Sequence, residues 1–273
     1  MCKRVSKPTF MSEFSLNNPP LICVVARVQF ARLAKIADYI PDLQEAFRLS
    51  GYPHFQEQKT KAWHIDDRAE AGVNVSYEEI PRWDFSNAER TVTIRVDRES
   101  LAVLFTAYDH YRNAEPHYQK ILGMVEKSIP GLLPQMVQLR YIGCILLEED
   151  SAPTDWVLPS VLAVPNLGEL KRGSSISETS FQTPEGGQLV TRCMSLGAGS
   201  PTLPPDLLPL NAPLRYPFPG ESPFLLLENL HQQPTKQTPF NAESCLSQIS
   251  ALRHHNAKVF QAIVTKKALE LWK

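Results

Sequence analysis

The order of apolar strand patterns and amphipathic helix patterns is the feature that most limits the fold of this chain. Residues 21–30, LICVVARVQF, are apolar and β-branched and predict a strand. Helical spacing begins near Ala34, and residues 111–129 carry the clearest helical stripe of the chain, at three- and four-residue intervals. Between these two helices we expect strands at 73–85, 90–97 and 100–108.

The same order of elements follows in the second half of the chain. Residues 139–149 predict a strand, and a short helical or irregular stretch is expected near 155–162. Further strands are expected at 174–183, 189–197 and 223–230, and a last long helix at 242–264.

We therefore expect an α+β fold built by internal duplication. It would have two β-α-β-β-β-α units, each an antiparallel sheet packed by a long amphipathic helix. The expected boundaries are a flexible tail at 1–18, a first unit at 19–135 and a second unit at 136–273. A single irregular α+β domain is the alternative.

A proline-rich insertion at 198–223 interrupts the second unit, with eight prolines in 26 positions. Such a stretch cannot continue a helix or a central strand. Because leucines and aromatic residues alternate with the prolines, we expect either an extended strap packed on the domain or a segment that docks a partner protein. The candidate partner surface consists of Leu207, Leu208, Leu214, Tyr216 and Phe218.

Composition excludes several classes of protein. A hydrophobic share of 43% and a net charge of −1 are typical of a globular chain without an overall basic excess. The five cysteines are widely spaced and form no C-x-x-C pair, so neither zinc ligation nor a disulfide framework is expected. We expect a cytoplasmic protein with no membrane partner, because no apolar run approaches membrane-spanning length.

Catalytic motifs are missing from the sequence. It contains no nucleophile elbow and no glycine-rich phosphate loop. Gly186-Gly187-Gln188 matches the tripeptide of peptide-chain release factors, but its setting is that of a hairpin turn. We therefore name no catalytic, cofactor-binding or metal-ligating residue, and we do not expect an enzyme, although the sequence leaves that class open.

Basic and aromatic residues interleave in the first half of the chain and define a candidate nucleic-acid face. Such faces bind single strands by stacking bases on aromatic rings beside cationic side chains. The aromatic members are Trp83, Phe85, Phe105 and Tyr108, and the basic members are Lys59, Lys61, Arg90, Arg95 and Arg98.

The chain resembles a family of sporadically distributed prokaryotic proteins of uncharacterised function. The resemblance rests on PPLICVVARVQF (19–30), WDFSN (83–87), LRYIGCI (139–145) and the stretch at 246–272. The family pattern has a glutamate in the opening strand and an asparagine after R-Y-[IV], where this chain has Cys23 and Gly143. The resemblance implies a role in a prokaryotic defence or mobile operon.

These observations lead to three function hypotheses. The first is a non-enzymatic binding or regulatory protein, an adaptor or antitoxin-like partner that binds another protein. The second is a ligand-binding domain or enzyme with a pocket between sheet and helix. The third is a nucleic-acid-binding protein that uses a curved sheet face. The sequence does not predict an oligomeric state.

Overall fold

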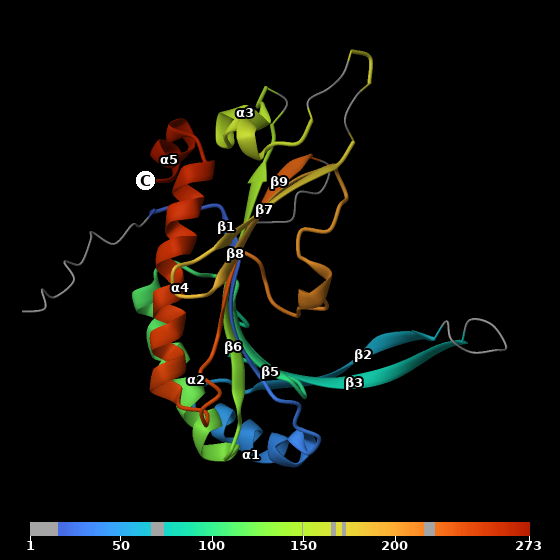
Figure 1. Cartoon of the computed structure of the whole chain (residues 1–273), viewed down its shortest axis with the longest axis vertical. Coiled ribbons are helices and arrows are strands. Elements are labelled where there is room, and N and C mark those ends of the chain that lie inside the picture. Colours follow the sequence, from blue (N-terminus) through green and yellow to red (C-terminus); the bar gives the residue numbers. More distant parts are fainter. Residues whose placement is uncertain (1–15, 67–73, 149, 165–167, 171–172, 216–221) are drawn as a thin grey trace, which may run out of the picture.

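Nine antiparallel strands form one continuous sheet in the computed structural model (Figure 1). The structure describes residues 16–66, 74–148, 150–164, 168–170, 173–215 and 222–273, and between 60 and 78 it describes backbone only. The strand order is β2-β3-β4-β5-β1-β6-β9-β8-β7. The strands are β1 (Leu21–Phe30), β2 (His54–Asp66), β3 (Asn74–Ser86), β4 (Val92–Val96), β5 (Ser100–Phe105), β6 (Pro134–Leu146), β7 (Ser175–Gln182), β8 (Gln188–Leu196) and β9 (Phe224–Pro234).

The expectation of two units with separate sheets is wrong. Strand β1 pairs with β5 on one side and with β6 on the other, so the two halves of the chain share one sheet. The β1–β6 ladder runs from Leu21 opposite Gly143 to Phe30 opposite Pro134. A strand buried on both faces needs a hydrogen-bonding neighbour along each edge, and β1 and β6 satisfy this need for one another.

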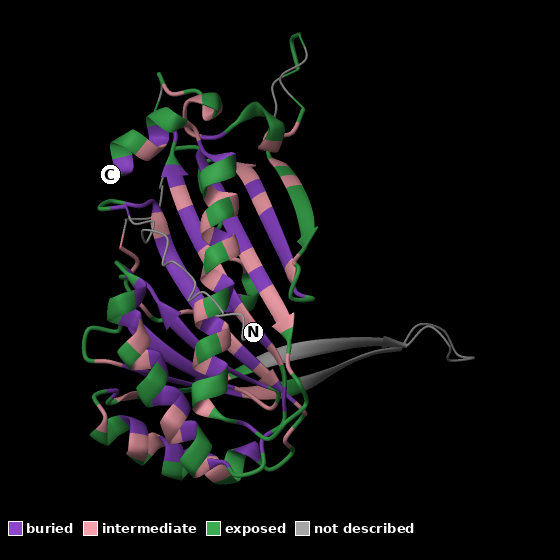
Figure 2. Ribbon diagram, turned by 60° about the vertical axis from the view of Figure 1, so that its left-hand side comes forward, coloured by how far each residue is buried: buried purple, intermediate pink, exposed green. Residues whose placement is uncertain are grey.

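The long helices pack on the same face of this sheet, and not one on each of two sheets (Figures 1 and 2). Their apolar stripes share a core with β1, β4 and β5 that includes Val24, Ile94 and Val103. The buried residues of the first two helices recur at helical spacing. In the last helix Ile249, Leu252 and Ile263 are buried, whereas Leu246, Val259 and Phe260, which were also expected toward the core, are only partly buried. The helices of this layer are α1 (Ile36–Leu49), α2 (Tyr111–Ser128) and α4 (Ala242–Ile263).

The carboxyl-terminal end of the described chain packs against its amino-terminal end. Trp156 stacks on Trp272 with ring centroids 5.9 Å apart, and the Asn18 amide donates a hydrogen bond to the Trp272 carbonyl. Within the described ranges, no helix combines the length and the apolar composition needed to cross a membrane. The short elements are α3 (Pro153–Trp156), α5 (Lys266–Trp272) and the 3₁₀ helices η1 (Pro159–Val161) and η2 (Pro205–Leu207).

Strands β2 and β3 extend from the sheet as a hairpin arm (Figure 1). They pair over thirteen positions, whereas the β3–β4 ladder covers only 83–86 of β3. Strand β2 was not expected from the sequence, because its residues HFQEQKTKAWHID are largely polar and carry no apolar alternation. The first half of the chain therefore has four strands after α1, where three were expected.

The single sheet makes a direct prediction for fragments of the chain. Residues 19–135 expressed alone would leave the ten-residue apolar strand β1 without its β6 neighbour, and such an open apolar edge promotes aggregation. We expect this fragment to be aggregated or unfolded by size-exclusion chromatography and circular dichroism. Co-expression with residues 136–273 is expected to restore a folded complex. A monodisperse, folded 19–135 fragment would contradict the shared sheet.

Candidate functional site: the polar face under the strap

The proline-rich segment crosses the sheet face opposite the helices (Figure 1). We call residues 198–215 the strap. Leu203 and Leu207 are buried against apolar side chains of β1, β5, β6 and β9, and Asn211 reaches Gln56 on β2 at the far end of the sheet. The segment therefore packs on the domain as a strap, which is one of the two sequence alternatives, although it is not extended throughout because Pro205–Leu207 form the 3₁₀ turn η2.

One polar residue after another lines this face beside the strap. Directly paired residues of an antiparallel sheet point to the same face, so the strand register defines a row that runs across all nine strands. Eight of the nine side chains in this row are polar. We call it the polar row, in strand order Gln56, Asp84, Arg95, Ala102, Arg27, Gln138, Gln232, Gln188 and Gln182.

Arg95 is the most deeply buried charge of the polar row, with 2% of its surface exposed. Its guanidinium donates two parallel hydrogen bonds of 2.8 Å to the carboxylate of Asp84. Its remaining donors bind the strap, at 2.9 Å from the carbonyl oxygens of Leu207 and Pro209. Bidentate pairing of this kind fixes the plane of the guanidinium. The N–H groups that bind the carbonyl oxygens of the strap are therefore held in a fixed orientation.

A second ionic group lies across β1, β6, β9 and β8. Arg140 donates to Asp206 of the strap at 2.8 Å and to Glu228 at 2.9 Å. Arg27 lies 4.0 Å from the same Asp206 carboxylate, and Arg192 donates to Glu228 at 3.0 Å. Asp206 is therefore a carboxylate of the strap held between two arginines of the sheet.

Several arginine donors on this face remain without an acceptor. The buried Nε atoms of Arg27, Arg82 and Arg140 find no hydrogen-bond partner among the described residues. An unmet buried donor costs about 1–3 kcal/mol, so three of them mark a place suited to further oxygen acceptors. Burial lowers the pKa of Arg27, and the nearby Asp206 carboxylate opposes that shift. Burial and the neighbouring Arg95 lower the pKa of Arg82 in the same way.

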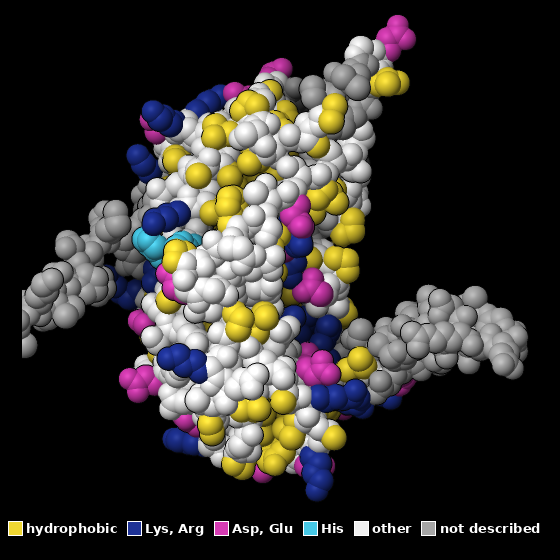
Figure 3. All heavy atoms as spheres, viewed as in Figure 1, with side chains coloured by type: hydrophobic (Ala, Val, Ile, Leu, Met, Phe, Trp, Pro, Cys, Tyr) yellow, Lys and Arg dark blue, Asp and Glu magenta, His cyan; other side chains and the backbone are white. Residues whose placement is uncertain are grey.

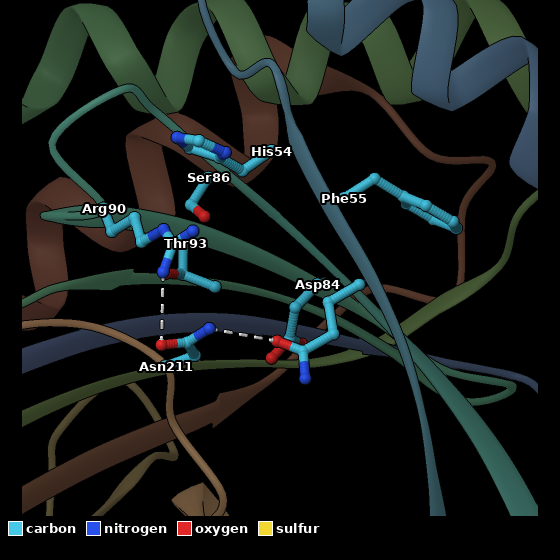
Figure 4. Close-up of a pocket in the computed structure, with 8 residues that line it drawn as sticks. His54, Phe55, Asp84, Ser86, Arg90, Thr93 and Asn211 are labelled. Carbon is cyan, nitrogen blue, oxygen red and sulfur yellow. Dashed lines mark hydrogen bonds between the residues drawn. The ribbon is translucent and has the colours of Figure 1, made fainter.

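A small hollow opens beside Asn211 of the strap, over β2, β3 and β4 (Figure 4). Arg90 donates to the Asn211 side chain at 3.4 Å, and Asn211 donates to Gln56 at 3.5 Å. The hollow has a volume of about 70 Å³, well below the roughly 300–1,000 Å³ typical of small-molecule sites. His54, Ser86 and Thr93 complete its polar wall.

The nucleophile candidates of the described chain are poorly placed for chemistry. Burial raises the pKa of Cys23 to about 12 and that of Cys144 and Cys245 to about 11, which keeps these thiols protonated and unreactive. Among the described residues, no three histidine, cysteine or acidic side chains are grouped to hold a metal ion. Gly186 and Gly187 form the expected turn between β7 and β8.

The structure places the predicted partner residues at different depths. Leu207 is buried, Leu208 is 40% exposed, and Leu214 packs partly buried beside the strap core. Tyr216 and Phe218 lie outside the described residues.

The predicted basic residues do not form one surface patch. Lys59 is an exposed arm residue that pairs with Glu79 at 3.1 Å, and only the backbone of Lys61 is described. Arg90 lies at the hollow in the β3–β4 turn, and Arg98 is half-buried in the β4–β5 turn. Arg95 is buried under the strap.

The aromatic side chains of the predicted nucleic-acid face lie on the helix side of the sheet. Trp83, Phe85 and Phe105 are buried there in the core with α1 and α2, and so is Tyr108. Alternation along a strand sends neighbouring residues to opposite faces, so these rings and Arg95 do not share a surface. The predicted aromatic residues therefore provide no stacking platform beside the arginines of the strap side.

Four arginines that define this face were not predicted from the sequence: Arg27, Arg82, Arg140 and Arg192. Their signal was present, because an arginine within a short apolar strand is seldom buried without a partner. Cys23 and Gly143, where the resembled family has polar residues, lie at the same end of the neighbouring strands β1 and β6.

Comparisons with known proteins add no family. No protein-family model matches the chain, and a search of curated proteins finds no match. The family resemblance seen in the sequence therefore stays a prediction.

The Arg95–Asp84 pair gives a stability prediction. Asp84→Ala leaves the charge of Arg95 buried without its carboxylate, a change that costs about 3–5 kcal/mol in comparable sites. We expect a loss of about 3 kcal/mol in the free energy of unfolding, measured by urea titration. The matched control is Glu45→Ala, which breaks the fully exposed Glu45–Arg48 pair and should leave the free energy of unfolding nearly unchanged. Equal losses in the two variants would refute a structural role for the buried pair.

Proposed function

We propose that this chain is a non-enzymatic binding protein whose polar sheet face holds an extended acidic segment of a partner protein. In the structure the strap occupies this face. The partner segment replaces the strap along the part of the polar row that contains Arg95 and Arg27, which we call the arginine half. This proposal keeps the binding-protein class expected from the sequence. The site, however, is the sheet face that the strap covers.

The observation that carries the proposal is the way in which the sheet holds the strap. Two arginines share the carboxylate of Asp206, while Arg95 and Arg82 take the backbone carbonyls of Leu207, Leu208 and Pro209. Carboxylate recognition by arginine combined with main-chain contacts is how an extended acidic peptide is recognised. The strap is held through the same kinds of contact, with its carboxylate, Asp206, presented on the 3₁₀ turn η2.

The glutamine half of the polar row continues this surface past the strap. Gln138 donates to Gln232 at 3.1 Å, and Gln232 donates to Gln188 at 2.8 Å, so their amides form a ladder across β6, β9 and β8. These three side chains are partly exposed. Each amide carries donors and acceptors, which suits the main chain of a peptide.

A peptide fits this face better than a single-stranded nucleic acid does. Sequence-independent strand binding uses aromatic rings as stacking platforms beside the cations. Trp83, Phe85 and Phe105 are buried on the opposite face. The hollow beside Asn211 is small for an organic substrate, so the enzyme hypothesis gains no support from it.

Competition with the strap would make binding conditional. A tethered segment competes at an effective concentration on the order of millimolar, so a partner must bind more tightly than the strap does. The protein would then act as a regulator or adaptor whose sheet face is exposed only to a partner segment that binds more tightly than the strap. The role in a defence or mobile operon rests on the family resemblance alone and stays a prediction.

The proposal is tested with the strap supplied as a separate peptide. The host is a variant in which residues 202–211 are replaced by a Gly-Ser linker of equal length. Its ligand is a fluorescent peptide with the sequence of residues 200–215, followed by anisotropy. We expect the opened variant to bind this peptide at least about tenfold more tightly than the intact protein does, because the tethered strap competes in the latter.

A matched peptide and a second host keep this test decisive. The same peptide with Asp206→Asn should bind about tenfold more weakly, because it lacks the charge shared by Arg27 and Arg140. If the linker variant fails to fold, the full chain with Asp206→Ala retains the buried leucines of the strap and serves as the host. Absence of peptide binding to a folded host would refute the proposal. Tighter, strongly salt-dependent binding of an oligothymidine would instead select the nucleic-acid hypothesis.

A further inference from the structure

Strand β7 forms a free edge of the sheet (Figure 2). Among the described residues it pairs only with β8. Its eight residues, SISETSFQ, contain neither proline nor lysine, the residues with which exposed edges are commonly protected. An unprotected edge of this length is a template for another strand.

The outward hydrogen-bonding groups of β7 follow from its pairing with β8. The Thr183 amide donates to the Gly187 carbonyl at the turn, and in an antiparallel ladder such paired positions alternate. The odd-numbered residues of β7 therefore bond to β8. The amides and carbonyls of Ile176, Glu178, Ser180 and Gln182 face the free edge.

Strand β7 carries two exposed apolar side chains, and hydrophobic side chains are also spread over the face of the molecule seen in Figure 3. Ile176 is 65% exposed and Phe181 is 42% exposed, and the register places them on opposite faces of β7. Val164 and Leu170, in the segment that precedes β7, are 65% and 71% exposed.

We propose that β7 pairs antiparallel with β7 of a second copy of this chain, with the two-fold axis at Thr179. With a two-fold axis perpendicular to the sheet, the two copies form one continuous sheet with the same face on the same side. Because the axis passes through Thr179, odd-numbered residues of one β7 lie opposite odd-numbered residues of the other. Centring on Thr179 places Glu178 opposite the partner's Ser180 and Ile176 opposite the partner's Gln182. About eight main-chain hydrogen bonds then form between the four outward residues of each copy.

The charge pattern of β7 favours this register over the neighbouring one. Centring on Glu178 would place two carboxylates opposite one another, and like charges directly opposed destabilise a strand pair. With the axis at Thr179, no charged residue of β7 opposes a like charge, because Glu178 is the strand's one charged residue. Glu178 also keeps its own partner, Arg192 of β8.

The inference is tested by a charge exchange at Thr179, an exposed residue. Thr179→Lys and Thr179→Glu each place like charges opposite one another across the axis, so each variant alone is expected to be monomeric. An equal mixture of the two is expected to dimerise. Sedimentation velocity is measured at about 100 µM protein, well above the micromolar Kd expected of such an interface. Thr179→Ala is the control and is expected to remain dimeric like the unmodified chain.

Each result of this experiment has a defined meaning. Circular dichroism melting shows that the variants are folded before they are compared. A monomeric unmodified chain overturns the proposal, and so does a dimer that the single charged variants leave intact. Monomeric single variants whose mixture also stays monomeric overturn the axis at Thr179. None of these measurements involves the strap, so they are independent of the proposed peptide site.

Discussion

The arginines on one face of the sheet set the constraint on which the rest of this structure depends. A guanidinium stays protonated at any physiological pH, so each buried arginine must find acceptors or a counter-charge. Arg95 has Asp84, and Arg192 has Glu228. Arg82 pairs with no described carboxylate within 4 Å, and Arg27 approaches only that of Asp206 in the strap. The sheet face is therefore incomplete without the strap.

The composition of the strap fits this requirement. Proline has no amide hydrogen and cannot donate to a strand ladder, so Pro204, Pro205 and Pro209 keep the segment from pairing as a strand, and its one regular element is the short 3₁₀ turn η2. The carbonyl oxygens of Leu207, Leu208 and Pro209 are therefore free to accept from arginine. The buried Leu203 and Leu207 anchor the segment on the apolar part of the sheet. The prolines and leucines of the strap thus have different roles in its contact with the sheet: the prolines leave carbonyl oxygens free for the arginines, and the leucines pack on the apolar part of the sheet.

Local patterns in the sequence predicted local elements well. The apolar strand at 21–30 and the helical stripes at 111–129 and 242–264 lie where periodicity placed them, because each pattern is a direct record of burial. Periodicity carries no information on which distant strands become neighbours, so the β1–β6 pairing was missed and two sheets were expected in its place. The polar strand β2 was missed because most of its residues form an arm beyond the sheet core. The site itself depended on Arg27 and Arg140, single arginines in apolar strands whose partner Asp206 lies far away in sequence.

The coupling between Asp206 and Arg140 tests most directly whether the sheet holds the strap as a ligand. A double-mutant cycle with Asp206→Asn, Arg140→Gln and the double variant measures it through the free energy of unfolding in urea. Since the two side chains are 2.8 Å apart, we predict that the losses of the single variants overlap by about 1 kcal/mol or more. Losses that add to within about 0.3 kcal/mol would contradict the account, because the strap would then lie on the arginine face without being recognised by it.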